Sequence, residues 1–337
     1  MNRIKGSQSI QFETPPYLIS SGSVAGSKES EGPLGTLFDM IEKDDLFGEK
    51  TWEAAESRMQ LNACLLALSK ANMEPSEIRY LFGGDLLRQG IATSMGVETL
   101  QIPMFGLYGA CSTSGEAIAL SAMAVAGDYG GNMLAVTSSH FGSAEKEFRF
   151  PLGYANQRPL SAHWTVTGSG AFIIGTGKSH VQITGVTVGK IVDYGLKDSQ
   201  NMGACMAPAA ANTILQNFAD FECTEKEYDK IITGDLGYIG QAILWDLVQE
   251  QGRDIKDKHM DCGVEIFNQK SQDTHAGGSG CGCAAVVLSA FILPKIEKGE
   301  WKKILFVPTG ALMSTVSYNE GESVPGIAHG IVLEHCS

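Results

Sequence analysis

The stretch Gly109-Ala-Cys-Ser-Thr-Ser-Gly-Glu-Ala117 carries the clearest structural signal in the chain. Small residues around Cys111 are typical of a tight turn, and an apolar helix is predicted directly after it, over Ser114–Ala126. A helix start offers free backbone N–H groups and the positive end of the helix dipole. We therefore expect Cys111 to have a lowered pKa and to be a candidate nucleophile. The alternative is a small buried residue in a tightly packed helix.

This stretch has a counterpart 168 residues further along the chain. Ala119-Leu-Ser-Ala122 returns as Val287-Leu-Ser-Ala290, and the same offset aligns Gly109-Ala-Cys111 with Gly277-Gly-Ser279. Two further pairs occur in the same order, namely Gly84-Asp-Leu86 with Gly234-Asp-Leu236, and Met133-Leu-Ala-Val136 with Ile304-Leu-Phe-Val307. The repeat predicts a duplicated fold. Its first half is residues 1–179 with Cys111, and its second half is residues 180–337 with the glycine-rich turn 276–282.

Strands and helices alternate along both halves. Strands are predicted over residues 79–84, 133–138, 170–175, 181–188, 230–233, 303–308 and 326–333. Helices are predicted over residues 52–73, 114–126, 209–218, 241–251 and 282–293. This alternation indicates the α/β class with largely parallel sheet. If the halves pack about a pseudo-twofold axis, the helix starts near Cys111 and Gly280 converge on one pocket that suits an anion or an oxyanion.

Composition excludes several classes of partner. The chain has 337 residues, 43% of them hydrophobic, and a net charge of −13, so it is globular and poorly suited to nucleic acid or anionic lipid. Met1–Gly6 lacks the apolar core of a signal peptide, and no segment reads as a membrane span. Cys281-Gly-Cys283 has the wrong spacing for a zinc knuckle, and no dedicated calcium loop is present. We expect no cofactor and no protein-held metal.

The residues around Cys111, together with the duplicated halves, resemble the thiolase and ketoacyl-ACP synthase III superfamily. Further motifs resemble, more closely, the stage V sporulation protein AD family of endospore-forming bacteria. They are Glu31-Gly-Pro-Leu-Gly35, Gly84-Asp-Leu-Leu87, Thr137-Ser-Ser-His140, Thr165-Val-Thr-Gly-Ser-Gly170, Asp198-Ser-Gln-Asn-Met-Gly203, Met206-Ala-Pro-Ala-Ala210, Ala276-Gly-Gly-Ser-Gly-Cys-Gly-Cys283 and Ile327-Ala-His-Gly330.

This resemblance implies a thiolase-like fold of α-β-α-β-α layers and a protein that binds dipicolinic acid, either free or as its calcium chelate. It implies a part in dipicolinate uptake into the developing spore, beside SpoVA membrane proteins that supply the channel. The protein would then lie at the spore inner membrane through these partners. Proteins of the wider superfamily pair as homodimers, which we expect here through the strand Met133–Ser138.

The sequence favours a binding protein over an enzyme. The condensing enzymes that it resembles need a histidine in a turn of the second half and a second His or Asn before the glycine-rich helix. The first place here holds Gly234-Asp-Leu-Gly237, and no histidine occurs between His180 and His259. His275 falls near the second place. We therefore predict a non-catalytic protein. The alternatives are an acyltransferase that uses Cys111 and a scaffold that only anchors channel proteins.

The candidate ligand-binding residues end predicted strands or begin predicted helices. They are Asp85, Cys111, Ser112, Ser139, His140, His275, Gly277 and Gly278. Asp85 is expected to bond the ligand or its calcium, whereas Asp235 is expected to cap a helix or turn. His140 and His275 have the alternative of a loop residue that is bonded to backbone or faces solvent. Arg149 and Arg158, in the loop Phe141–Pro159, are candidate carboxylate partners, with a solvated loop as the alternative.

Overall fold

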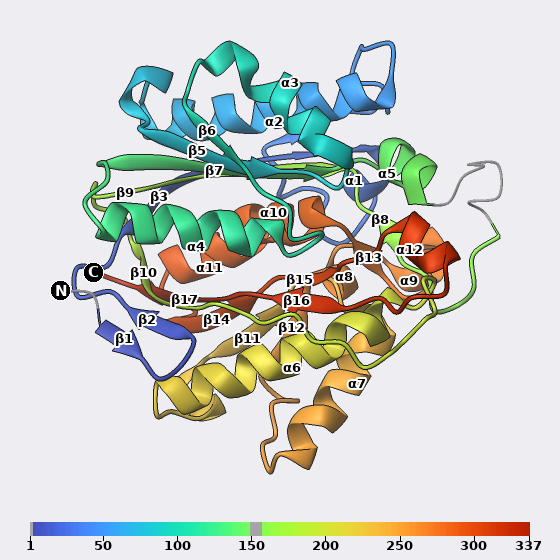
Figure 1. The fold of residues 1–337 in the computed structure, drawn as a ribbon. Helices are drawn as coiled ribbons and strands as arrows, with labels where there is room; N and C mark the ends of the chain where they lie inside the picture. The colour runs from blue at the N-terminus through green and yellow to red at the C-terminus, as the bar shows by residue number, and fades with distance from the viewer. Residues whose placement is uncertain (1–2, 149–156) are drawn as a thin grey trace.

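The computed structural model describes residues 3–148 and 157–337, whose main strands form two stacked layers (Figure 1). The first layer contains β3 Tyr17–Ala25, β5 Tyr80–Gly84, β6 Met104–Gly106, β7 Asn132–Ser139 and β9 Gly168–Gly175. Their spatial order is β6-β5-β7-β9-β3. Strand β5 is parallel to β6 and β7, whereas β9 is antiparallel to both β7 and β3.

The second layer repeats this arrangement. It contains β10 Val181–Thr187, β11 Lys230–Thr233, β12 His259–Asp261, β14 Lys303–Val307 and β17 Gly330–His335. Their order is β12-β11-β14-β17-β10, with parallel pairs around β11 and antiparallel pairs around β17. Counted in chain order, both layers run third, second, fourth, fifth, first. The predicted duplication is therefore confirmed by strand topology.

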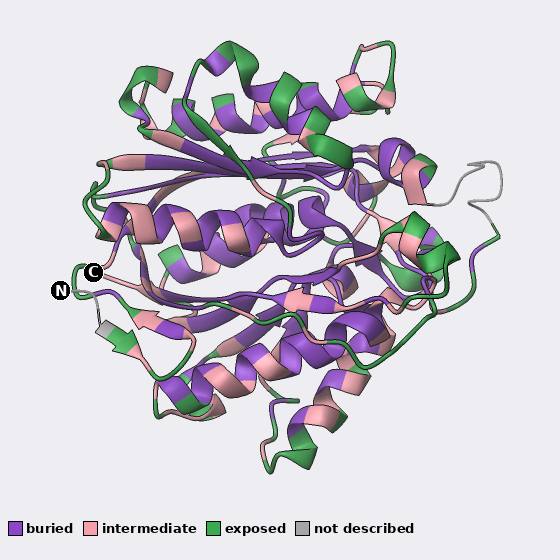
Figure 2. Cartoon of the chain, in the orientation of Figure 1, coloured by how far each residue is buried: buried purple, intermediate pink, exposed green. Residues whose placement is uncertain are grey.

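Helices separate and cover these two layers. Between the layers lie α4 Thr113–Ala126 and α10 Cys281–Val287, which contact each other and the first layer, and α4 also contacts β17 (Figure 1). Helices α2 Trp52–Ala71 and α3 Ile91–Val97 lie outside the first layer, and α6 Met202–Asp220 and α7 Gly237–Glu250 lie outside the second. All of α10 is buried (Figure 2). The predicted α-β-α-β-α layering is thus confirmed.

The described chain also contains shorter strands and α-helices. They are β1 Arg3–Lys5, β2 Ser9–Gln11, β4 Met40–Ile41, β8 Trp164–Thr165, β13 Gly278–Ser279, β15 Thr309–Ala311, β16 Gly326–Ala328, α1 Ser27–Ser30, α5 Phe141–Phe148, α8 Cys262–Glu265, α9 Gln269–Gln272, α11 Leu293–Glu297 and α12 Thr315–Asn319. Strand β2 pairs with β10, so the first strands of the chain pack on the second half. Among these described residues, no helix has the length and apolar character required to cross a bilayer.

Each predicted strand and helix overlaps an observed one, and three of the differences are informative. Helix α6 begins seven residues before the predicted Ala209 because the side chain of Asn201 caps it by accepting from Ala204 N–H. The predicted helix 282–293 is interrupted by a π-helical turn at Leu288–Ile292. The predicted strand 326–333 is divided at His329 into β16 and β17.

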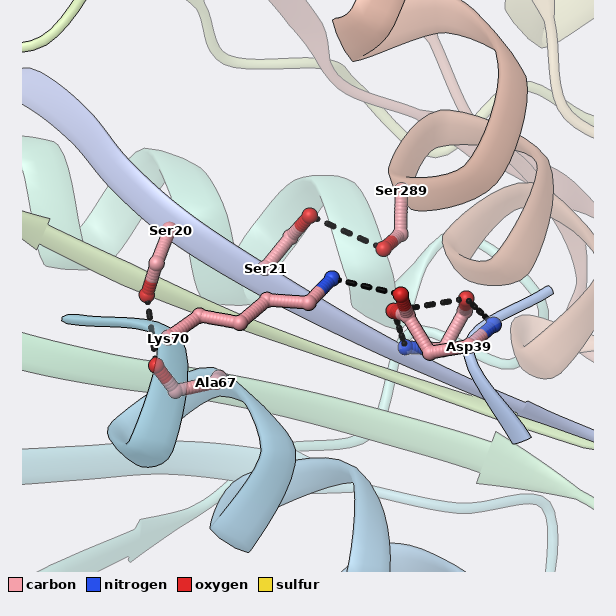
Figure 3. Close-up of polar contacts among 7 residues, drawn as sticks. Ser20, Ser21, Asp39, Ala67, Lys70 and Ser289 are labelled. Carbon is pink, nitrogen blue, oxygen red and sulfur yellow. Dashed lines mark hydrogen bonds and ion pairs between the residues drawn. The ribbon is translucent and has the colours of Figure 1, made fainter. Parts of the chain in front are cut away.

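Strand β3 is absent from the sequence prediction, although it lies between β9 and β10, where the two layers are joined into one continuous sheet. Its serines disguise it, because hydroxyls are uncommon in a buried strand unless they have partners. Figure 3 shows those partners: Ser20 donates to a carbonyl of α2 at 2.7 Å, and Ser21 lies 2.9 Å from Ser289. The Ser23 hydroxyl donates to Asp39 at 3.1 Å. With these bonds made, the strand can be buried.

Strand β7 is an interior strand of the first layer. It pairs with β5 on one side and with β9 on the other along its length. It therefore has no free edge with which to pair with a second copy, so the expectation that Met133–Ser138 forms the dimer interface is wrong. The homodimer itself stays a prediction. The free end of this layer is β6, because β3 at the other end pairs with β10, and Phe105 on β6 is exposed.

Candidate functional site

Cys111 lies in the turn that leads from β6 into α4. The backbone at Ala110 takes a left-handed conformation, with φ of 49°. Two side chains close the turn: Ser112 Oγ donates to the Gly109 carbonyl at 2.7 Å, and Thr113 Oγ1 donates to the Ala110 carbonyl at 2.6 Å. Cys111 is buried, directly before the first turn of α4. The predicted position of this residue at a helix start is confirmed.

The glycine-rich turn of the second half meets this cysteine. Strand β13 pairs in parallel with β8, and Gly280, with φ of 112°, leads into α10. The turn begins at Gly277, whose φ of 115° also favours glycine. Ser279 Oγ lies 3.7 Å from Cys111 Sγ. These two residues are equivalent positions of the repeat, so the two helix starts converge as the sequence predicted.

Asp235 accepts hydrogen bonds from polar groups at the start of α10. Its Oδ2 accepts from Ser279 Oγ at 2.7 Å and from Gly280 N–H at 3.1 Å, and its Oδ1 accepts from Thr309 Oγ1 at 2.6 Å. The expected capping role of Asp235 is thus observed, and it places a carboxylate next to Cys111. The sequence analysis did not include Asp235 in the site. Its equivalence to Asp85 in the repeat was the available signal.

The thiol of Cys111 is held in its neutral form. Burial raises its pKa well above the ordinary value of 9.0, and the nearby charge of Asp235 raises it further. The expectation of a lowered pKa is therefore wrong. The helix start does not offset removal from water and a neighbouring negative charge.

A small, mostly apolar cavity surrounds Cys111. It is lined by Leu86, Tyr108, Ala110, Cys111, Glu145, Phe148, His163, Thr165, Met202, Ser279, Gly280, Ala311 and Met313. His163 was not predicted, although it lies two residues before the quoted motif Thr165–Gly170. Its Nε2 lies 3.1 Å from the Leu236 carbonyl, so this ring nitrogen is directed at backbone.

A second, wider cavity adjoins the first, and Tyr108, Phe148 and Met313 line both. Its volume is about 440 Å³, and it opens to solvent. Its polar side chains come from three segments: the loop and helix at 87–94, α5, and the start of α12. They are Arg88, Gln89, Thr93, Ser94, Glu147, Ser314 and Thr315. We call this space the outer cavity and the space around Cys111 the inner cavity.

Asp85 is fully buried and supports the rim of the outer cavity. Its Oδ1 accepts from Leu87 N–H at 2.8 Å. Its Oδ2 accepts from Thr93 N–H at 2.8 Å and from Thr93 Oγ1 at 2.6 Å. Burial raises the pKa of this carboxyl. Asp85 lines neither cavity, and both its oxygens have protein partners.

The two candidate serines are also bonded within the protein. Ser112 Oγ closes the Cys111 turn, as described above. Ser139 Oγ donates to the Val166 carbonyl at 2.7 Å and accepts from Gly282 N–H at 3.1 Å. Ser139 thereby ties the end of β7 to α10. Both side chains position the site and neither lines the inner cavity.

The two candidate histidines lie apart from Cys111. His140 Nε2 is 2.7 Å from the Asp45 carbonyl, and burial lowers the pKa of this ring. It lines a separate pocket. His275 Nδ1 is 2.8 Å from the Pro159 carbonyl, and its Nε2 is 3.0 Å from Asp273. Each therefore adopts the backbone-bonded arrangement that was the alternative expectation, and neither lines the inner cavity.

Arg158 is also engaged away from the inner cavity. Its guanidinium donates to the Asp273 carbonyl at 2.6 Å and lies over the Trp164 ring at 4.8 Å. Arg149 lies outside the described residues. Within residues 3–148 and 157–337, no three His, Cys, Asp or Glu side chains are grouped so that they could share a metal ion.

Two matching halves with a cysteine between their central helices define a thiolase-like protein. Solved structures share this fold: 3-oxoacyl-[acyl-carrier-protein] synthase III from Aquifex aeolicus VF5 has a TM-score of 0.57 at 12% identity, covering 95% of this chain and 100% of its own. OleA from Xanthomonas campestris bound with cerulenin has a TM-score of 0.62 at 14% identity, covering 96% and 97%.

The chain belongs to the stage V sporulation protein AD (SpoVAD) family, whose model matches residues 6–334. Stage V sporulation protein AD from Bacillus subtilis (strain 168) is 42% identical to it over 332 residues, which is 98% of each chain. The resemblance stated from the motifs is thus confirmed. Membership of this family supports a role in sporulation.

Proposed function

We propose that this protein binds dipicolinic acid, free or as its calcium chelate, and takes part in its uptake into the developing spore. Family membership supports the sporulation role, and the resemblance described above supports the ligand. The protein would act at the spore inner membrane beside SpoVA membrane proteins. In this proposal the protein binds dipicolinate, and the SpoVA membrane proteins form the channel.

The observation that favours a binding protein over an enzyme is the contact of Cys111 with Ser279, whose hydroxyl donates to Asp235. A condensing enzyme needs an imidazole that takes up and returns a proton at neutral pH. A serine hydroxyl cannot store a proton in this way, and the carboxylate behind it opposes formation of a thiolate. The one imidazole among the described residues that line the inner cavity, His163, has its Nε2 directed at the Leu236 carbonyl, which also favours binding over acyl transfer.

Calorimetric titration of the full-length protein with dipicolinic acid, with and without calcium, tests this proposal. Saturable binding is expected for the wild type. Cys111→Ser should retain it, because a hydroxyl of similar size preserves the cavity wall, whereas Cys111→Trp should lose it by filling the cavity.

An acyl-CoA incubation followed by intact-mass measurement tests the acyltransferase alternative. No mass increase is expected. Absence of dipicolinate binding together with acylation at Cys111 would overturn the proposal. Assembly with the membrane partners but no ligand affinity would instead favour a scaffold.

A further inference from the structure

The inner cavity alone is poorly equipped to hold a dianion. Asp235 already accepts the Ser279 hydroxyl and the Gly280 N–H at the second helix start. Glu145 also lines this cavity. A ligand with two carboxylates needs a positive partner to offset its desolvation, and no lysine or arginine of the described residues lines the inner cavity.

The outer cavity provides such a group. Arg88 is the only lysine or arginine among the described residues that line it. Its Nε lies 2.8 Å from Glu147 Oε1, its Nη2 donates to Thr315 Oγ1 at 3.3 Å, and its side chain is 63% exposed. A guanidinium presents its donors in a planar fork that fits a carboxylate, so the position that Glu147 occupies on Arg88 can also take the carboxylate of a ligand.

The loop that carries Arg88 is held in a defined conformation. Gln89 and Gly90 both have φ of 58°, which is a costly conformation for the non-glycine residue. Asp85 fixes both ends of this segment through Leu87 N–H and Thr93. Asp85 is therefore a positioning residue for the loop. Preorganisation of this kind lowers the ordering cost of binding an anion at Arg88.

We propose that Arg88 is the carboxylate-recognition residue of the site, for a small aromatic dicarboxylate. On binding, a ligand carboxylate replaces Glu147 on the guanidinium, and the ligand ring packs against Tyr108 and Phe148 at the junction of the two cavities. This inference rests on the proposed function and names the residue that gives it specificity. Glu147 is then a built-in competitor that occupies Arg88 in the absence of ligand.

The two members of this ion pair give opposite predictions. Arg88→Gln should weaken dipicolinate binding at least tenfold, and Arg88→Lys should weaken it less, because an ammonium keeps the charge but loses the fork. Glu147→Gln should strengthen binding several-fold, because the competitor is removed. If the ion pair only stabilised the fold, Arg88→Gln and Glu147→Gln would change the dipicolinate affinity in the same direction. Lys146→Gln removes one positive charge, as Arg88→Gln does, but from the exposed neighbour of Glu147. This control should leave the affinity within about twofold, since exposed charges are largely screened.

Titration with isophthalate separates this inference from the proposed function. Isophthalate has the same two carboxylates but lacks the ring nitrogen that helps dipicolinate to chelate calcium. If isophthalate binds and dipicolinate does not, and the Arg88 variants weaken isophthalate binding, the assignment of Arg88 would be supported and the dipicolinate proposal overturned. Dipicolinate binding that is unchanged in both Arg88 variants, with melting temperatures like the wild type, would overturn the Arg88 assignment and retain the function. Absence of binding by both ligands would overturn both.

Discussion

The carboxylate of Asp235 lies one hydrogen bond away from the hydroxyl that contacts Cys111. Sequence reasoning placed Cys111 correctly, because a small-residue turn before an apolar helix is a local pattern. The repeat equates Asp235 with Asp85, but it does not show where the carboxylate points. Asp235 is 124 positions away from Cys111 along the chain, and its direction depends on Ser279 and Thr309. Local pattern predicts where a nucleophile would lie, and tertiary contacts decide whether it is ionised.

The reactivity of Cys111 toward iodoacetamide at pH 7 tests this electrostatic argument. A thiol of pKa 9.0 or above is at most about 1% ionised at this pH, so slow alkylation is expected. Asp235→Asn should increase the alkylation rate, because it removes the negative charge and keeps an amide oxygen that can accept from Ser279. Peptide mass spectrometry identifies the modified residue, and Cys111→Ser is the control for assignment. Equal rates in the wild type and the Asn variant would contradict the assigned role of Asp235.

At the scale of elements, the Cys111 turn is supported by β15. A Cβ atom on Gly310 would lie 2.3 Å from the Gly109 carbonyl and 3.0 Å from Ser112 N. Because backbone of the two halves meets here with no room for a side chain, β15 can cover the turn only with glycine at this position. The close approach fixes the distance between α4 and the second layer.

Gly310→Ala should consequently reduce the free energy of unfolding by about 1–3 kcal/mol, which is the usual cost of overpacking. Urea unfolding followed by circular dichroism measures this change. Gly131→Ala is the matched control, because a Cβ at Gly131 has no atom within 4 Å and should leave the stability nearly unchanged. Similar stability of both variants would show that the two segments can separate without cost.

The strands also show which elements the hydrophobic pattern of the sequence can predict and which it cannot. Strands β5, β7, β9 and β14 have apolar runs and were predicted close to their observed bounds. Strand β3 was missed because Ser20, Ser21 and Ser23 interrupt its apolar pattern, and only their distant partners make burial favourable. His140 and His275 were chosen for their position after a strand or before a turn. The backbone carbonyls that hold both rings away from Cys111 leave no local signal.

At the scale of the whole molecule, the buried carboxyl groups link stability to pH. Burial raises the pKa of Glu56 to about 8 and the pKa values of Glu29 and Asp261 to about 7. In the unfolded chain these groups have the ordinary values of 4.5 for Glu and 3.8 for Asp. Between those values and pH 7–8 the folded protein binds more protons than the unfolded chain. The stability that they contribute is therefore complete below about pH 4 and is lost as the pH rises to about 8.

Glu56→Gln should make the free energy of unfolding less dependent on pH between pH 5 and pH 8. One carboxyl contributes at most about 1.4 kcal/mol per pH unit, and the amide is neutral throughout. Urea titrations at four pH values give the slope, with the exposed Glu322→Gln as control. An unchanged slope in the Glu56 variant would mean that Glu56 is ionised in the folded protein at neutral pH.

The contact between Cys111 and Ser279 also bears on the ancestry of the molecule. In a symmetric pair of identical ancestral chains, a site on the twofold axis must present the same residue from both sides, so every mutation there is made twice. Once the two copies are joined in one gene, each side of the axis can change alone. A thiol can then persist on one side while a serine replaces its counterpart. Gene fusion thus converts a symmetric site into one whose two walls evolve independently.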